Sequence, residues 1–220
     1  MTSLFRNSYL MKPINTLLTI LFISLLSSPS WSVTFDDLVK RDDLYYEKFT
    51  DVPFTGKVTG EEQGSFRNGE REGTWVIYWE NGQLWQKGNY KSNKREGAWA
   101  RYSKNGQVFF QENYKNDKRE GAQAKYYENG QLWYKGNYKN GKREGAWVNQ
   151  YANGQLMHKD NYINGKREGA FVEYHNNGQL WSKGNYENGK REGTWVVYNW
   201  DGTVHKIVTG TFKDGVKISD

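Results

Sequence analysis

Hydrophobic and polar residues alternate along nearly the whole chain after residue 33, and no long stretch shows the period of a helix. Segments rich in Trp, Tyr, Val and Leu are separated by Asn-Gly or Asp-Gly pairs, at gaps that alternate between 11 and 13 residues. Aromatic and β-branched residues favour strands, and Asn-Gly supplies the two positive φ angles of a type I′ turn. The pattern therefore predicts a continuous meander of β-hairpins.

The tripeptide Arg-Glu-Gly recurs at a fixed interval of 24 residues, and its six copies begin at Arg71, Arg95, Arg119, Arg143, Arg167 and Arg191. A fixed period in this range is typical of repeat architectures. Each copy carries two turn signals, so we expect two strands per repeat. Ser92–Asn93 and Asn116–Asp117 stand where other copies have Asn-Gly, and turns are still expected there because Asn and Asp tolerate left-handed backbone.

The predicted fold is all-β: an elongated, single-layer antiparallel meander of tandem hairpins, twisted or curved. Residues 64–207 would hold six repeats, in a sheet about 60 Å long at about 4.8 Å per strand. Residues 33–63 would form an N-terminal cap with a degenerate first repeat, and residues 208–220 a C-terminal cap half-repeat. Within the N-terminal cap we expect a short helix from Phe35 to Leu44.

The register of the hairpins predicts which residues share a face, since paired residues point the same way. A two-residue turn at Asn153–Gly154 pairs Gln150 with Met157 and Trp147 with Asp160, and the turn at Asn140–Gly141 puts Glu144 beside Lys135. One face then carries Trp147, Tyr151, Leu156, His158 and Tyr162. The Leu156 and Tyr162 columns are nearly uniform across the copies, which indicates packing, and Phe212 is expected to continue the Tyr162 column.

Three other columns on this face vary from copy to copy. Variation along a rigid ladder can encode binding specificity, although unconstrained surface positions are the alternative interpretation. Aromatic rings offer rigid, amphipathic area of the kind that dominates binding hot spots. The predicted partner-binding patch is therefore the ring-rich part of these columns: Phe110, Tyr127, Tyr134, Tyr151, His158 and His175.

Residues 1–32 have the features of a secretory signal peptide. Two basic residues, Arg6 and Lys12, precede an apolar run from Ile14 to Leu26, and small residues follow the run. The run has 13 residues, whereas a membrane span needs about 20. We expect cleavage before Val33 and an exported protein, periplasmic or secreted.

The composition excludes several function classes. The chain has no Cys, which rules out a disulfide framework and a thiol nucleophile, and its three His residues share no column or metal-binding spacing. The Arg and Glu of Arg-Glu-Gly recur in every copy, whereas a catalytic residue is needed once. The net charge of +6 is modest and spread along the chain, unlike the basic stripe of a nucleic-acid reader. We expect no enzymatic activity, no metal, no cofactor and no nucleic-acid partner.

The twelve residues GNYKNGKREGAW at 136–147 resemble a MORN motif (membrane occupation and recognition nexus). The 24-residue spacing and the following NGQL segment are similar to the bacterial MORN-repeat variant, whose members are often labelled as antitoxin components of the YwqK type. The segment 52–56 resembles the degenerate first repeat of that group. The resemblance covers about 43–215, would make this chain an exported form, and implies binding and scaffolding without a catalytic residue.

Two functions remain open from the sequence. The first is a non-catalytic scaffold for protein–protein interaction in the cell envelope, with an unknown protein as partner. The alternative is a binder of cell-surface ligands (peptidoglycan, glycan or phospholipid headgroups) through the aromatic ladder. Aromatic-glycine hairpins also resemble choline-binding and glucan-binding surface repeats, which use their rings in this way.

Overall fold

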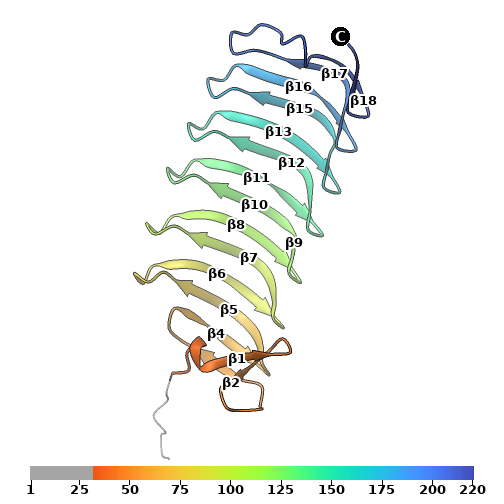
Figure 1. The fold of residues 1–220 in the computed structure, drawn as a ribbon. Helices are drawn as coiled ribbons and strands as arrows, with labels where there is room; N and C mark the ends of the chain where they lie inside the picture. Colours follow the sequence, from red (N-terminus) through yellow and green to blue (C-terminus); the bar gives the residue numbers. More distant parts are fainter. Residues whose placement is uncertain (1–31) are drawn as a thin grey trace, which may run out of the picture. The chain divides into compact units, whose positions relative to one another are not determined.

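A computed structural model describes residues 32–220, so nearly all of the predicted signal peptide lies outside the described residues. Figure 1 shows a long antiparallel sheet in which successive hairpins lie side by side along one axis. Within residues 32–220 this sheet has 17 strands, paired mostly with their neighbours along the chain; β8 pairs with both β9 and β10, and β13 pairs with both β14 and β15. The predicted all-β meander of tandem hairpins, with two strands per repeat, is confirmed.

The described chain opens with the 3₁₀ helix η1 (Phe35–Asp37) and a separate two-stranded sheet, β1 (Leu38–Arg41) and β2 (Leu44–Glu47). The strands of the long sheet follow in chain order: β3 (Gly56–Val58), β4 (Glu62–Arg67), β5 (Glu70–Tyr78), β6 (Leu84–Lys91), β7 (Lys94–Tyr102), β8 (Val108–Lys115), β9 (Lys118–Arg119), β10 (Gly121–Tyr126), β11 (Leu132–Lys139), β12 (Lys142–Gln150), β13 (Leu156–Ile163), β14 (Lys166–Arg167), β15 (Gly169–Tyr174), β16 (Leu180–Glu187), β17 (Lys190–Val197), β18 (Gly210–Lys213) and β19 (Val216–Ser219).

The helix expected from Phe35 to Leu44 is wrong beyond its first turn. Thr34 donates its backbone N–H and its hydroxyl to the Asp37 carboxylate, which supports a single 3₁₀ turn. The chain then becomes extended and reverses at Asp42–Asp43, whose φ angles are +48° and +64°. Two adjacent acidic residues that tolerate left-handed backbone form a hairpin turn here in place of a helix.

The turns that precede each Arg-Glu-Gly are of the predicted type. Asn140 and Gly141 have φ angles of +52° and +80°, the two positive values of a type I′ turn. Both irregular dipeptides do the same: Ser92–Asn93 at +47° and +62°, and Asn116–Asp117 at +50° and +63°. The expectation of turns at these positions is confirmed.

The turns at the other end of the hairpins are not type I′, which corrects the predicted register. At Asn153–Gly154 only the glycine has positive φ, and the loop closes through Tyr151 N–H donating to Gln155 O at 2.9 Å. Asn153 Oδ1 accepts the Gln155 N–H at 3.0 Å, which favours this wider loop. Gln150 therefore lies opposite Leu156, not Met157, while the predicted pairing of Trp147 with Asp160 is confirmed.

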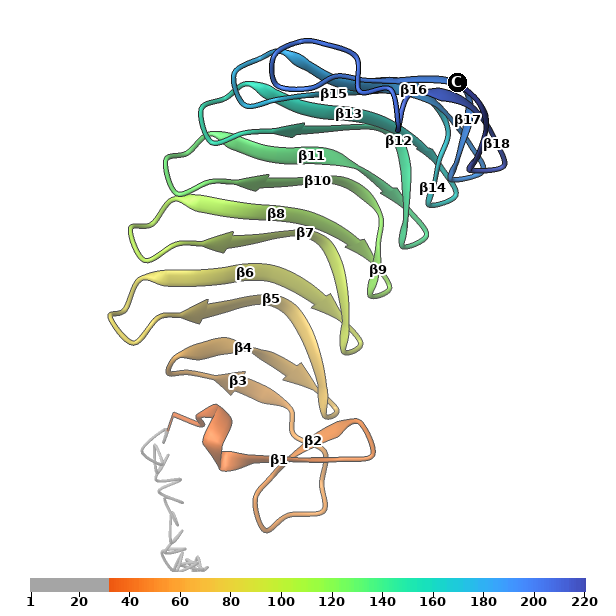
Figure 2. The same cartoon turned by 45° about the horizontal axis from the view of Figure 1, so that its top comes forward.

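The glycine of Arg-Glu-Gly bends its strand. Gly145 has φ +68°, and the register jumps there, from Asn137 opposite Glu144 to Lys135 opposite Val148. A positive φ inside a strand strongly favours glycine. Figure 2 shows the bend in every repeat. The end of each hairpin that carries the type I′ turn, where β9 and β14 lie, turns away from the rest of the sheet.

The core lies on one side of the sheet, which we call the Trp face, after its central column of Trp75, Trp99, Gln123, Trp147, Phe171 and Trp195. Trp147 is 1% exposed although the sheet is a single layer. Its indole lies flat on Gly136 of the neighbouring strand, where an added Cβ would be 2.2 Å from the ring. Tyr138 packs edge-on against it at 5.3 Å, and the Arg143 guanidinium lies 4.4 Å from its centroid. The bend thus brings the residues near the type I′ turn, such as Tyr138 and Arg143, over the indole in the middle of the hairpin.

Both ends of the ladder carry their own cluster. At the N-terminal end, Leu38 and Val58 are buried against Phe66 and Trp75. At the C-terminal end, Phe212 is buried against Trp195, and the Arg191 guanidinium lies 5.4 Å from its ring. Phe212 does continue the Tyr162 column, as the sequence predicts.

Candidate functional site

The Glu of each Arg-Glu-Gly links its repeat to the next one. Glu144 Oε2 accepts the backbone N–H of Asn164, the first turn residue of the following hairpin, at 2.9 Å. The same bond occurs in all six copies, with donors at Ser92, Asn116, Asn140, Asn164, Asn188 and Asp214 and distances of 2.7–3.0 Å. Glu144 lies opposite Asn137, so the predicted pairing with Lys135 is wrong. The bend at Gly145 shifts the register and turns this carboxylate toward the next turn.

The Arg of the tripeptide makes the matching contact inside the bend. Arg143 Nη1 donates to the Tyr162 hydroxyl of the next repeat at 3.0 Å, and its carbonyl accepts the Gly165 N–H at 2.9 Å. Arg143 also lies across from Tyr138, as predicted from the sequence. Each part of Arg-Glu-Gly therefore has a role in holding successive repeats together, and none is free for chemistry.

Two repeats fill the Trp face differently from the others. Where the other copies have a glycine beneath Trp, the third copy has Glu112 beneath Gln123 and the fifth has Asp160 beneath Phe171. Both carboxylates are only 3% exposed. Glu112 forms ion pairs with Arg101 at 3.5 Å and Arg119 at 3.3 Å, so its charge is compensated.

Asp160 has a similar set of partners. Its oxygens lie 3.2 Å from Arg167 Nε and 3.4 Å from His158 Nε2. Burial lowers the pKa of His158 below its ordinary value, and the nearby Arg167 and Arg143 charges lower it further, against the opposing effect of Asp160. These buried acids are not apparent from single columns of the sequence, because their signature is that the Gly and the Trp of one copy change together.

The predicted partner-binding residues fall into two rows on the Trp face. Phe110, Tyr134 and His158 lie in one row that crosses the strands, each opposite a residue of an adjacent strand. Phe110 is only 7% exposed, while Tyr134 and His158 are half-buried. Tyr134 lies 6.0 Å from Trp147, ring centre to ring centre, so part of this row belongs to the core.

The second row, Tyr127, Tyr151 and His175, lies at the turns and also joins repeats. Tyr127 donates its hydroxyl to Gln150 O at 2.8 Å, and Tyr151 donates to Tyr174 O at 2.9 Å. His175 is 6% exposed. Binding by these six residues stays a prediction, but these rings also make contacts that hold the ladder together, as the residues of the Tyr162 column do.

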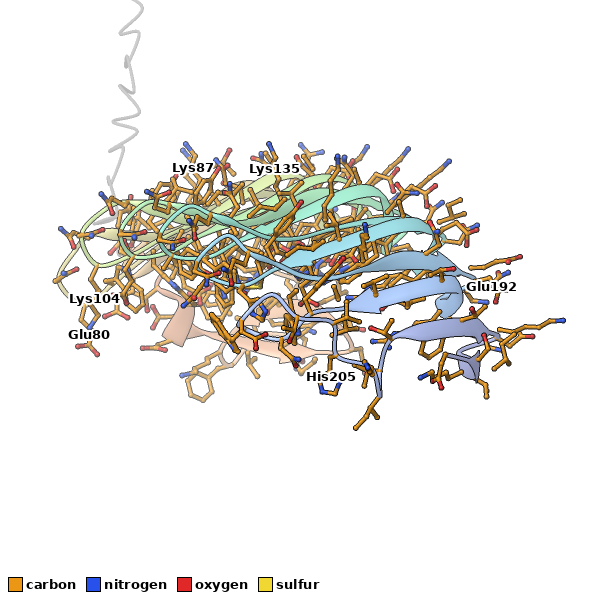
Figure 3. All side chains as sticks on the ribbon, turned by 90° about the horizontal axis from the view of Figure 1, so that it is seen from above. Glu80, Lys87, Lys104, Lys135, Glu192 and His205 are labelled. Atoms are coloured by element: carbon orange, nitrogen blue, oxygen red, sulfur yellow. The ribbon has the colours of Figure 1, made fainter. Side chains whose placement is uncertain are left out.

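The opposite side of the sheet carries a shallow groove that the sequence analysis did not predict. We call this side the alanine face, because small residues at 98, 100, 122, 124 and 146 line its central depression of about 740 Å³. Asn89, Asn113 and Asn137 line it as well, and Lys87 and Lys135 stand beside them. Figure 3 shows these two lysines projecting from the same side of the sheet.

The same columns form two more depressions in the later repeats. One is lined by Ala146, Lys159, Asn161 and Ala170, and the next by Ala170, Lys183, Asn185 and Thr194. Ala146 and Ala170 are shared between neighbours, so the three make a row along repeats two to six. Alanine is a poor strand former, so β-propensity does not account for its presence here. The sequence does show these small residues as nearly uniform columns, but uniform columns are also typical of structural positions and do not by themselves indicate a groove.

No group of three His, Asp or Glu side chains suited to hold a metal ion occurs within residues 32–220. In the same part of the chain, no helix has the length and hydropathy to cross a membrane.

A family comparison matches five consecutive stretches of the sequence: residues 71–92, 95–116, 119–140, 143–164 and 167–188. Its description is MORN repeat variant, and the stretches together cover half of the chain. The chain belongs to the MORN repeat variant family. Each matched stretch starts at the Arg of Arg-Glu-Gly and ends in the next type I′ turn, so one MORN unit contains the whole link from one repeat to the next.

Curated proteins gave no match to this MORN repeat chain. Among solved structures it is similar to the crystal structure of the GtfA/B complex bound to UDP and GlcNAc, at 15% identity and a TM-score of 0.17. The alignment covers 60% of this chain and 24% of that one, so the chain spans about a quarter of the length of its match. A TM-score this low shows no shared overall fold.

Proposed function

We propose that this MORN repeat protein is an exported, non-catalytic scaffold that binds a protein partner in the cell envelope. The observation that carries the proposal is the row of depressions on the alanine face. Repeat proteins commonly use the extended surface created by their stacking as the binding surface. The Arg-Glu-Gly motifs that recur in every copy hold successive repeats together and so make the ladder rigid. These links leave the alanine face available to a partner.

The groove has the chemistry for an extended, acidic protein segment. Its floor of small side chains admits a backbone at close range, and the Asn amides can donate to and accept from peptide groups. Lys87, Lys135, Lys159 and Lys183 recur along it and favour negative charge. One repeat advances about 9.6 Å, close to the length of three extended residues.

The test is binding of an acidic, extended peptide to the full chain and to two groove variants, measured by fluorescence anisotropy. Ala122→Trp fills the groove, and Lys135→Glu with Lys159→Glu reverses its charge; both should weaken binding at least tenfold. Lys104→Glu is the matched control, because Lys104 lies at the hairpin turns, near Glu80 and away from Lys87 and Lys135 (Figure 3). Equal binding by all four proteins would refute the role of the groove.

Export is tested separately. A C-terminally tagged full chain should fractionate with the periplasm or medium and should be shorter by the predicted signal peptide. A full-length protein that stays in the cytosol would refute this part of the proposal.

A further inference from the structure

A stack of three rings stands at the C-terminal end of the ladder. The His175 ring lies between two indoles, with its centre 5.5 Å from Trp181 and 4.1 Å from Trp200 and with interplanar angles of 23° and 26°. Trp181 is 41% exposed and Trp200 62%, whereas the indoles of the central column are nearly inaccessible. Two indoles stacked on one imidazole and exposed to water differ from the buried indoles of the core and offer flat apolar area to a ligand.

The stack lines a pocket of about 710 Å³ together with polar side chains, among them Asn199, Asp201 and His205. Asp201 accepts hydrogen bonds from the Thr203 hydroxyl and the Thr203 N–H, and these bonds lower the pKa of its carboxyl. Asn199 Nδ2 donates to the Thr203 hydroxyl at 3.0 Å, which fixes the amide. The pocket therefore combines flat apolar surface with planar polar groups in set orientations.

One buried atom in this pocket has no partner. His175 Nε2 is inaccessible and makes no hydrogen bond to any part of the chain that the structure describes. Buried polar atoms are hydrogen-bonded as a rule, so an orphaned one indicates a missing partner. A ligand hydroxyl that reaches Nε2 as the exposed Trp200 ring shifts would supply it.

We propose that this pocket binds a neutral saccharide. A sugar ring has apolar C–H faces that stack on indole and hydroxyls at its rim that pair with carboxylate, amide and imidazole. An anionic ligand fits poorly, because no Lys or Arg of the described chain lines the pocket and Asp201 does. A quaternary ammonium is also disfavoured, since cation–π attraction is strong only when the cation is desolvated, and both indoles are partly exposed to water, with one face of each on His175.

The site is independent of the groove in the proposed function. His205 projects from the side of the sheet opposite to Lys87 and Lys135 (Figure 3). A sugar bound here and a protein segment bound on the alanine face would not compete, so the failure of either proposal leaves the other standing.

The experiment titrates the full chain with cellohexaose, maltohexaose and chitohexaose, and separately with choline and inorganic phosphate, and follows Trp fluorescence and calorimetry. Binding of at least one oligosaccharide, with no response to choline or phosphate, is expected. Trp200→Ala should weaken that binding at least tenfold. His175→Phe keeps a ring in the stack but removes Nε2, and should weaken binding by a similar factor with an unchanged melting temperature.

Trp85→Ala is the matched control, because Trp85 holds the place of Trp181 in the first repeat and lies outside the pocket. It should bind sugar as the unaltered chain does. Failure of all three oligosaccharides, a response to choline or phosphate instead, or full binding by the folded Trp200→Ala protein would overturn the proposal. If circular dichroism shows that Trp200→Ala does not fold, the sugar affinity of His175→Phe alone tests the proposal, and unweakened binding by that variant overturns it.

Discussion

The repeats of this ladder solve one packing problem in two ways. In four copies, such as the one with Gly136 and Trp147, an indole lies directly on a glycine. In the copies with Glu112 and Asp160, a buried carboxylate replaces the glycine, and the indole above it gives way to Gln123 or Phe171. The comparison teaches that the two positions form one unit: a side chain beneath the ring is possible only where the ring is smaller or absent, and where arginines compensate its charge.

The largest expected effect comes from mixing the two solutions. Gly136→Asp places a carboxylate where a Cβ alone would be 2.2 Å from the Trp147 ring. The indole must move, and a charge is buried beneath it where Arg143, which holds the place of Arg167 beside Asp160, is the available partner, so we expect a loss of about 3–5 kcal/mol in the free energy of unfolding. Urea unfolding followed by circular dichroism measures it.

Adding Trp147→Phe to Gly136→Asp recreates the pair found in the fifth copy and should recover part of the loss. The coupling between the two substitutions should be about 1–3 kcal/mol. Simple additivity would mean that Gly and Trp do not act as one unit, which contradicts the comparison.

The next largest effect is a difference in stability between losing an arginine in a repeat with a buried acid and losing one in a repeat without it. Arg119→Ala removes one partner of the buried Glu112 and should cost about 3 kcal/mol, the lower end for breaking a buried pair, because Arg101 remains. Arg191→Ala, in a copy without a buried acid, loses stacking on Trp195 and Phe212 and should cost about 1 kcal/mol. Thermal or urea unfolding compares them. Equal losses would show that Glu112 does not depend on its ion pairs.

Much of this fold could be read from the sequence, because its causes are local and repeated. Asn-Gly and Asn-Asp dipeptides specify the type I′ turns, and the 24-residue period gives the hairpin order. The turn at Asn153 could not be read in the same way, since the same Asn-Gly dipeptide forms a wider loop when its side chain bonds to the Gln155 N–H. The following Gln supports this loop as well, because its side-chain oxygen accepts from Asn153 Nδ2 at 3.1 Å, a contact that hairpin turn rules based on the Asn-Gly dipeptide alone do not consider.

The candidate site was harder to predict, for a physical reason. Uniform columns such as Ala122 and Ala146 look structural, although they line the groove, and varied rings such as Tyr151 look free, although its hydroxyl bonds to the next repeat. Whether a column is buried depends on the bend at Gly145, a three-dimensional feature that alternation along a strand does not reveal. The ring stack at His175 also depends on Trp200, which stands at a repeat position where earlier copies have Asn176, Ala152 or Glu128.

A smaller effect tests what the two kinds of repeat share. Glu144→Ala, in a Gly–Trp copy, and Glu168→Ala, in the copy with Phe171, each remove the acceptor of one turn N–H, at 2.9 and 2.8 Å. Each should cost about 1 kcal/mol, and the two losses should agree, because this link does not involve the Trp face. The corresponding Gln variants keep an acceptor oxygen and should cost less. A clear difference between the two Ala variants in urea unfolding would show that the buried acid influences the turn as well.

The smallest effect is a pH dependence confined to the fifth copy. Burial, with Arg167 and Arg143, lowers the pKa of His158 in the folded chain below its ordinary 6.5. As the pH falls through 6.5, the unfolded chain therefore takes up this proton first, and the free energy of unfolding decreases until the folded chain also binds it. His158→Tyr, which inserts the residue that the third copy carries at position 134, should flatten the profile between about pH 5 and pH 8. His175 and His205 are present in both proteins and cancel in the comparison. The same slope in the two proteins would show that His158 is protonated as easily in the ladder as in the unfolded chain, and the fifth copy would then differ from its neighbours in packing alone.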